Sequence, residues 1–153
     1  MTELGRRLLA TSLLPTGRDL SILSGVMDLA EVVGRALLAL LFILEAIAKL
    51  GAYEMAGRYM AAFGMPPSLL PLAVIAELSG GVMITIGYRT RAAALMFAAF
   101  CAVTAFVFHS KFSDHNQLLH FEKDLALAGA FLVLWARGPG RYALDTLRLG
   151  SPR

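Results

Sequence analysis

Two oppositely charged side chains interrupt one of the most apolar stretches of this sequence. Glu45 and Lys49 lie in LLFILEAIAKL, residues 40–50. Residues four positions apart share one face of a helix, and glutamate before lysine is the order that favours an ion pair within the helix. A lone charge at the centre of a bilayer costs about 2.5–3.5 kcal/mol on insertion scales. We therefore expect Glu45 to pair with Lys49 or with Lys123.

Further ionisable residues occur at comparable positions in the later apolar runs. Glu77 lies about 12 Å into a run that starts at residue 69, at 1.5 Å per residue, and we expect it to pair with a basic group from another helix or to stay protonated. The sequence HFEKD, residues 120–124, opens the last run, and His109 ends the run before it. These positions predict one polar layer in the outer half of a helical bundle. Its predicted members are Glu45, Lys49, Glu77, Glu122, Lys123 and Asp124, with His109 and His120 as candidate additional ligands.

Metal, haem and nucleophile chemistry have less support. His109 and His120 approach the same level from adjacent antiparallel helices, but haem needs axial ligands that face each other across the ring, and the sequence has no CxxCH motif. Cys101 is the only cysteine, which excludes an internal disulfide and any site built from several thiolates. Ser79 and Ser110 lack a GxSxG setting. We expect no metal or haem, and the residues predict no catalytic group.

The composition is typical of a membrane protein. Of the 153 residues, 58% are apolar and 16% are charged, whereas soluble domains have about 45–50% and about 25%. Four apolar segments approach the roughly 20 residues needed to cross a bilayer core, namely 29–50, 69–86, 92–108 and 118–135. Short connections make neighbouring helices antiparallel, so we predict an all-α membrane protein, a four-transmembrane-helix antiparallel bundle. AYEMAGRYMAAFG, residues 52–64, predicts a short interfacial helix between the first two.

Basic residues are concentrated on one side of the predicted bundle. Ten of the fourteen lie in the N-terminal arm with the start of the first helix, in the second loop and in the tail: Arg6, Arg7, Arg18, Arg35, Arg89, Arg91, Arg137, Arg141, Arg148 and Arg153. The positive-inside rule then predicts that both termini are cytoplasmic. The net charge of +3 is modest and its basic residues are scattered, so we expect no nucleic-acid partner.

The predicted domains are a cytoplasmic N-terminal arm (1–28), a transmembrane domain (29–136) and a cytoplasmic C-terminal tail (137–153). We expect the arm to be retained rather than cleaved as a signal peptide, because Pro15 breaks its apolar run. RGPGR, residues 137–141, predicts the end of the last helix, with its arginines at lipid headgroups.

Small residues accompany the polar positions and predict tight helix packing beside them. We expect three stripes to face the bundle interior: Ala76 and Gly80 beside Glu77; Ala94, Ala98, Cys101 or Ala102, and Ala105 before His109; and Ala126, Gly129 and Ala130 after Asp124.

Much of the chain resembles the DoxX family of small four-helix bacterial membrane proteins. The resembling stretches are GRALLALLFILEAIAKL (34–50), YMAAFGMPPSLLPLAVIAELSGGVMITIGYRTRAAAL (59–95), FHSKF (108–112) and HFEKDLALAGAFLVLWARGPGRYALD (120–145). The resemblance implies an inner-membrane, multi-pass protein whose relatives are linked to oxidoreductase assemblies, including quinone-linked thiosulfate oxidation and thiol and radical defence. It also implies recurrent polar positions at Lys49, Glu77, Lys123, Arg89, Arg91, Arg141 and Asp145. Many relatives have Lys-Asn where this chain has Lys123 and Asp124.

Three functions follow from these observations. The first is an accessory or anchor subunit of a membrane oxidoreductase system, quinone- or thiol-linked, with the polar layer near a quinone or a partner protein. The second is a proton-coupled small-solute carrier in which Glu77 titrates. The third is a purely structural membrane scaffold whose buried ions fix helix packing. The expected partners are the lipid bilayer and other subunits of a membrane redox complex. The expected cytoplasmic interface consists of Arg89, Arg91, Arg141 and Asp145.

Overall fold

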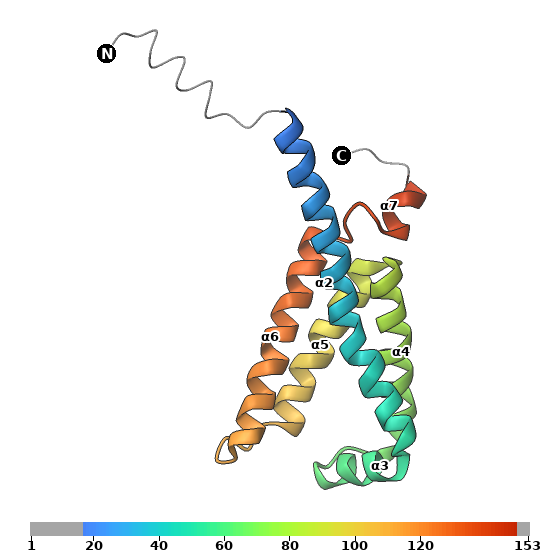
Figure 1. Ribbon diagram of the computed structural model, residues 1–153. Coiled ribbons are helices and arrows are strands. Elements are labelled where there is room, and N and C mark those ends of the chain that lie inside the picture. Colours follow the sequence, from blue (N-terminus) through green and yellow to red (C-terminus); the bar gives the residue numbers. More distant parts are fainter. Residues whose placement is uncertain (1–16, 150–153) are drawn as a thin grey trace, which may run out of the picture.

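The structure, a computed structural model, describes residues 17–149, and every regular element in that range is helical (Figure 1). The long helices are α2 (Gly17–Gly51), α4 (Leu70–Ile86), α5 (Thr90–Phe108) and α6 (His115–Arg137). The short elements are α3 (Tyr53–Ala62), the 3-10 helix η1 (Pro67–Leu69) and α7 (Leu144–Leu149). The predictions that concern Arg6, Arg7, Pro15 and Arg153 fall outside the described residues.

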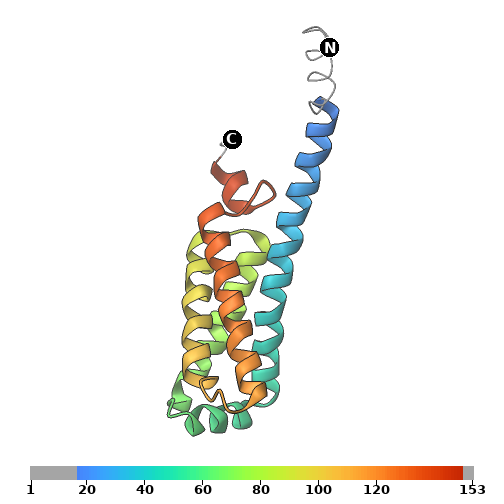
Figure 2. The same ribbon diagram turned by 90° about the vertical axis from the view of Figure 1, so that its left-hand side faces the viewer.

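The four long helices run in alternating directions and pack as an up-and-down bundle (Figures 1 and 2). α2 packs on α4, α4 on α5, and α5 on α6. α3 lies across one end of the bundle, which we call the α3 end. The opposite end, where α2 begins and α6 finishes, we call the terminal end. The all-helical prediction is confirmed, and a short helix follows the first long one as predicted.

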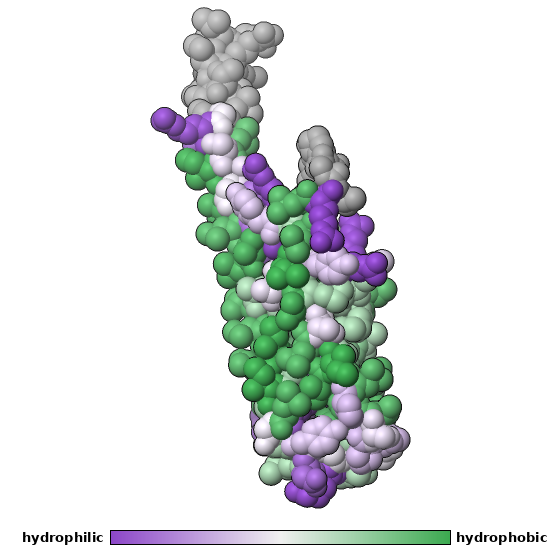
Figure 3. Space-filling model, turned by 90° about the vertical axis from the view of Figure 1, so that its right-hand side faces the viewer, coloured by the Kyte–Doolittle hydropathy of each residue, from purple (hydrophilic) through white to green (hydrophobic). Residues whose placement is uncertain are grey.

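Within residues 17–149, two helical stretches are long and apolar enough to cross a membrane, Pro67–Ile86 and Thr90–Phe108. Apolar surface covers the middle of the face that α4 presents, and polar surface lies at both of its ends (Figure 3). α2 and α6 carry more charged residues in or beside their apolar runs. That all four helices span a bilayer therefore stays a prediction.

α2 begins at Gly17, twelve residues before the predicted span at residue 29. The helical periodicity does not stop at 29, because Leu20, Leu23 and Met27 continue the apolar face. α6 also begins earlier than predicted, because the Asp114 side chain accepts a 2.9 Å hydrogen bond from the Asn116 backbone N–H and caps the helix.

The core is built from small residues and stacked rings. Ala94, Ala98 and Ala105 of α5 are buried as predicted. Phe97 lies between Phe42 of α2 and Phe131 of α6, with ring-centroid distances of 4.1 and 5.1 Å. These three rings connect the α2–α4 pair to the α5–α6 pair.

The predicted small-residue stripes are correct for Gly80 of α4 and wrong for Ala126 and Gly129 of α6, which are both exposed. A Cβ on Gly80 would lie 2.8 Å from the ring of Phe97, so this glycine is required for the approach of α4 to α5. A Cβ on Gly129 would meet nothing within 4 Å. Gly129 faces outward, because the buried face of α6 passes through Ala128 and Phe131 instead.

Candidate functional site

Lys49 is the centre of the first polar cluster, which lies toward the α3 end. Its Nζ donates to both carboxylate oxygens of Glu77, at 2.9 and 3.1 Å, and lies 3.4 Å from Glu45 Oε2. The Glu77 side chain is 3% exposed and that of Glu45 is 58% exposed. The expected pairing of Glu45 with Lys49 and of Glu77 with a base from another helix is confirmed.

The sequence of α4 explains why Glu77 points at α2. The buried residues of α4 recur at intervals of three and four and include Leu70, Val74, Glu77, Gly81 and Ile84. Glu77 therefore lies on the face that packs against α2, where Gly81 leaves room for Ile43. The carboxylate cannot be solvated there, so it depends on Lys49 for compensation.

A second polar cluster joins the end of α5 to the start of α6. The rings of His109 and His120 stack at 5.0 Å, and His109 Nδ1 lies 2.8 Å from Gln117 Oε1. His109 Nε2 is 3.9 Å from Asp124 Oδ2. This oxygen is buried and has no hydrogen-bond partner. A buried acceptor without a donor is uncommon in folded proteins and requires an explanation.

Sequence reasoning missed Gln117, although a usable signal was present. Gln117, His120 and Asp124 are three and four positions apart and share one face of a helix that begins at residue 115. The prediction started this helix at residue 118, which left Gln117 in a loop.

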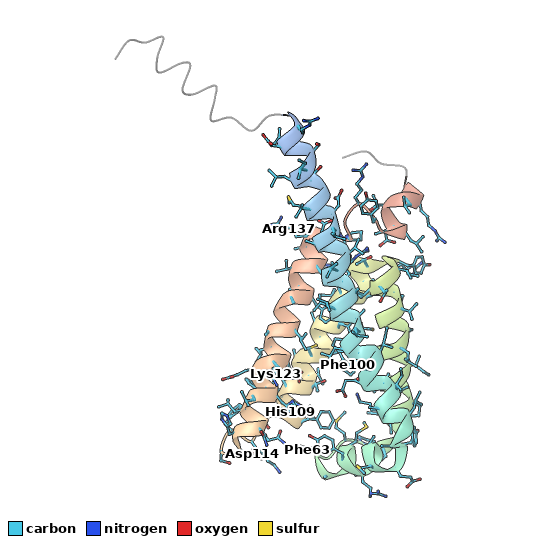
Figure 4. The ribbon with its side chains drawn as sticks, in the orientation of Figure 1. Phe63, Phe100, His109, Asp114, Lys123 and Arg137 are labelled. Atoms are coloured by element: carbon cyan, nitrogen blue, oxygen red, sulfur yellow. The ribbon has the colours of Figure 1, made fainter. Side chains whose placement is uncertain are left out.

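The predicted polar layer is thus divided between two helix pairs. Glu122 and Lys123 are exposed and have no side-chain partner among residues 17–149. Figure 4 shows Lys123, His109 and Asp114 toward the α3 end and Arg137 at the terminal end. Glu45, Lys49 and Glu77 form the first cluster, and His109, Gln117, His120 and Asp124 form the second.

Aromatic side chains from α3 cover the α3 end beside these clusters. The Phe108 ring of α5 lies 5.7 Å from Tyr59 and 5.6 Å from Phe63. Lys111 Nζ lies 5.1 Å from the centre of the Phe63 ring, in a cation–π contact. A surface hollow of about 280 Å³ between α3 and the start of α4 contains none of the polar-layer residues.

At the terminal end, Asp145 caps α5, although it lies 55 residues after Thr90 in the sequence. Its two carboxylate oxygens accept hydrogen bonds from the backbone N–H groups of Arg89 (2.7 Å) and Thr90 (2.8 Å). Its own backbone N–H donates to the Gly87 carbonyl at 2.9 Å. Gly87 adopts the left-handed conformation, φ 71°, and a Cβ there would collide with the Arg35 guanidinium. Asp145, predicted at a cytoplasmic interface, has a structural partner in this chain.

The segment around Asp145 also contacts α2, and we call residues 138–146 the clasp. Arg35 is 3% exposed and donates to the Tyr142 carbonyl at 2.8 Å. Arg141 lies 3.5 Å from Asp28, and Gly140 packs directly against the Glu31 side chain. The clasp therefore connects α2, α6 and the turn between α4 and α5. Arg89, Arg91 and Arg141 have exposed side chains around it.

Within the described part of the chain, no three His, Cys, Asp or Glu side chains are grouped so that they could hold a metal ion. The histidine cluster has two imidazoles and one carboxylate, but its geometry is that of a ring stack and a hydrogen bond.

Comparison with known proteins gives the family. The sequence model of the DoxX family matches residues 30–110, more than half of the chain. The chain belongs to the DoxX family. It is 41% identical over 120 residues to the Inner membrane protein YqjF of Escherichia coli K12, which covers 78% of this chain and 92% of that protein. It is 30% identical over 120 residues to the Inner membrane protein YphA of the same organism, covering 74% and 86%. No solved structure matches. This is a DoxX-family membrane protein, so the family resemblance is confirmed.

Proposed function

We propose that this DoxX-family protein is a multi-pass inner-membrane protein and an accessory or anchor subunit of a membrane oxidoreductase system, quinone- or thiol-linked. Its four long helices cross the bilayer with both termini cytoplasmic, and the polar layer faces the outer side. The names of the two relatives support the location. The family resemblance supports the link to redox assemblies.

The proposed site depends on one observation, a carboxylate oxygen of Asp124 that accepts no hydrogen bond. Asp124 Oδ2 is buried without a donor, and the nearest basic atom, His109 Nε2, is 3.9 Å away. A hydroxyl donor from a bound molecule would satisfy this oxygen. A hydroquinone supplies such a hydroxyl, and its aromatic ring suits the stacked rings of His109 and His120 beside Asp124. A polar side chain of a partner protein would supply the same kind of donor. The test therefore distinguishes a bound quinone from a bound protein.

The test compares three forms purified in mild detergent: the wild type, Asp124→Leu and Glu122→Gln. Mass spectrometry identifies the proteins and the extractable quinones that elute with each. We expect the wild type and Glu122→Gln to retain a quinone or a redox subunit, because Glu122 is exposed, and Asp124→Leu to lose it. Asp124→Asn, which keeps an acceptor oxygen, checks that any loss does not come from misfolding. A homogeneous wild-type monomer with neither quinone nor partner contradicts the proposal.

A second candidate, the structural scaffold, is favoured by the Lys49–Glu77 pair. Lys49 has two carboxylate partners in its own chain, so no bound molecule is needed to compensate its charge. Under this function Lys49→Met lowers stability, and any cellular phenotype falls only in proportion to the amount of folded protein. A variant with wild-type stability and a lost phenotype would instead indicate a functional site.

A further inference from the structure

A shallow apolar groove follows the outward face of α4 toward the terminal end. It has a volume of about 560 Å³, runs from Ile75 to Ile86 and ends at Tyr88, just beyond the helix. Ser79 is the only polar residue of α4 that lines it, and its hydroxyl already donates to the Ile75 carbonyl at 2.6 Å. Along α4 the groove therefore offers apolar contact and no hydrogen bond. Figure 3 shows this apolar face with polar surface beyond it at the terminal end.

The groove has the length of one bilayer leaflet. α4 belongs to a stretch that is long and apolar enough to cross a membrane, Pro67–Ile86. Ile75 and Ile86 are about 16 Å apart at 1.5 Å per residue, and half of a bilayer core is about 15 Å thick. Tyr88 then lies at the headgroup level, where tyrosine is enriched in membrane proteins. The groove thus has the length and the polarity that suit one acyl chain of a lipid.

Two arginines lie beside the Tyr88 ring at the headgroup end of the groove. Arg89 belongs to the turn between α4 and α5, and its guanidinium carbon lies 5.9 Å from the ring centre. Arg148 belongs to α7, and its guanidinium carbon lies 5.3 Å from the same ring centre. Both arginine side chains are exposed. Cation–π contacts of this kind hold both positive charges beside one ring, although the charges repel each other.

Neither of these arginines has a carboxylate partner within residues 17–149. Asp145 lies in α7 together with Arg148. Both carboxylate oxygens of Asp145, however, accept hydrogen bonds from the backbone N–H groups of Arg89 and Thr90. The two guanidinium groups therefore remain available to an anion from outside the chain.

We infer that this corner of the molecule binds one anionic phospholipid from the leaflet at the terminal end. Its phosphate lies between Arg89 and Arg148, because guanidinium groups bind phosphate oxygens through paired N–H donors. One acyl chain lies in the groove along α4. Basic groups at a helix end and an apolar surface below them are together complementary to such a lipid. This inference requires that α4 crosses the bilayer, and it does not depend on the redox role proposed above.

Native mass spectrometry tests the headgroup contact. The whole chain in mild detergent is titrated with dioleoyl phosphatidylglycerol, which is anionic, or with dioleoyl phosphatidylcholine, which has no net charge. We expect the first phosphatidylglycerol to bind at least about fivefold more tightly, the contribution of one arginine near an anionic lipid. Arg89→Gln with Arg148→Gln should bring this ratio to about one. Arg58→Gln with Lys123→Gln is the control, because it removes the same charge from exposed side chains at the α3 end. A wild-type ratio of one, or an equal loss in the control, overturns the inference.

A second pair of variants tests the groove. Ser79→Phe fills it, whereas Leu72→Phe places the same ring on α4 outside the groove, at a side chain that is 64% exposed. We expect only Ser79→Phe to weaken the binding of phosphatidylglycerol. Glycerol 3-phosphate, which has the phosphate without an acyl chain, should not displace the lipid at equal concentration. Equal affinity of the two variants, or displacement by glycerol 3-phosphate, would assign the arginines to a soluble anion and overturn the lipid site. Co-purification of a protein that is lost with Arg89→Gln and Arg148→Gln would also overturn it.

Discussion

At the residue scale, Lys49 balances two carboxylates that belong to two helices. Only one of them is buried, because the Glu77 side chain is 3% exposed and the Glu45 side chain is 58% exposed. Removing the lysine therefore leaves one uncompensated charge inside the bundle. The Glu45 side chain is largely exposed, so the loss of Lys49 costs it less than it costs Glu77.

We expect Lys49→Met to destabilise the protein measurably. Breaking a fully buried ion pair costs about 3–5 kcal/mol, and the loss here is smaller because the Lys49 side chain is 27% exposed. Reaction of the buried Cys101 thiol with a fluorogenic reagent during heating reports unfolding. Lys123→Met is the control and should unfold at the wild-type temperature. The double variant Lys49→Met with Glu77→Leu should recover part of the loss; no recovery would mean that Lys49 acts in some way other than by compensating Glu77.

Asp145→Ala removes the cap from α5. Loss of a helix cap typically costs about 0.5–2 kcal/mol, and this carboxylate accepts from two backbone N–H groups. We expect the same thermal assay to show lower stability, with a smaller effect for Asp145→Asn. Glu54→Ala is the control, because its side chain is 90% exposed. Equal stability of the alanine variant and the control would contradict a capping role.

Sequence reasoning found the first polar cluster but not the second in full. The cost of charge in an apolar run required partners for Glu45 and Glu77, and helical spacing pointed to Lys49. The Gln117 contact depended on where α6 begins, which is set by the Asp114 cap. The capping role of Asp145 could not be read from spacing, because it joins backbone groups 55 residues away.

At the element scale, the two glycines Gly80 and Gly129 differ in their packing. Gly80 lies against Phe97 of α5, whereas Gly129 faces outward. Gly80→Ala should lower stability, because its Cβ would meet Phe97, a fully buried ring held by Phe42 and Phe131. Gly129→Ala should be neutral or stabilising, since alanine is favoured over glycine in a helix by up to about 1 kcal/mol. The measurement is the unfolding temperature of each variant against wild type. Equal effects at both positions would contradict the observed α4–α5 contact.

At this scale the presence of the long helices was predictable from the sequence, and the residues at which they begin and end were less so. The apolar runs and the breakers between them located all four long helices. α2 was predicted too short because hydropathy identified the part suited to lipid, whereas the helix continues as an amphipathic segment back to Gly17. The clasp was predicted only as a helix stop, because its contacts with α2 come from tertiary structure.

At the scale of the whole molecule, the charge distribution predicts a testable topology. We expect a green fluorescent protein fused after residue 153 to fluoresce, because the proposed topology places that end in the cytoplasm. Alkaline phosphatase inserted in the loop between α5 and α6 should be active, because this enzyme works only outside the cytoplasm. The reverse pair of signals would place the polar layer on the inner side and contradict the proposed orientation.

The Asp145 cap has a consequence for how the chain is made. α5 begins at Thr90, and the carboxylate that caps it is added 55 residues later. At about 5–20 residues per second, this interval is roughly 3–11 s. During that time the first backbone N–H groups of α5 depend on water, headgroups or the insertion machinery. A nascent chain released before residue 145 would contain all four long helices but not the group that caps the third. The cap on α5 can therefore form only after the chain has been made through α6 and on to residue 145.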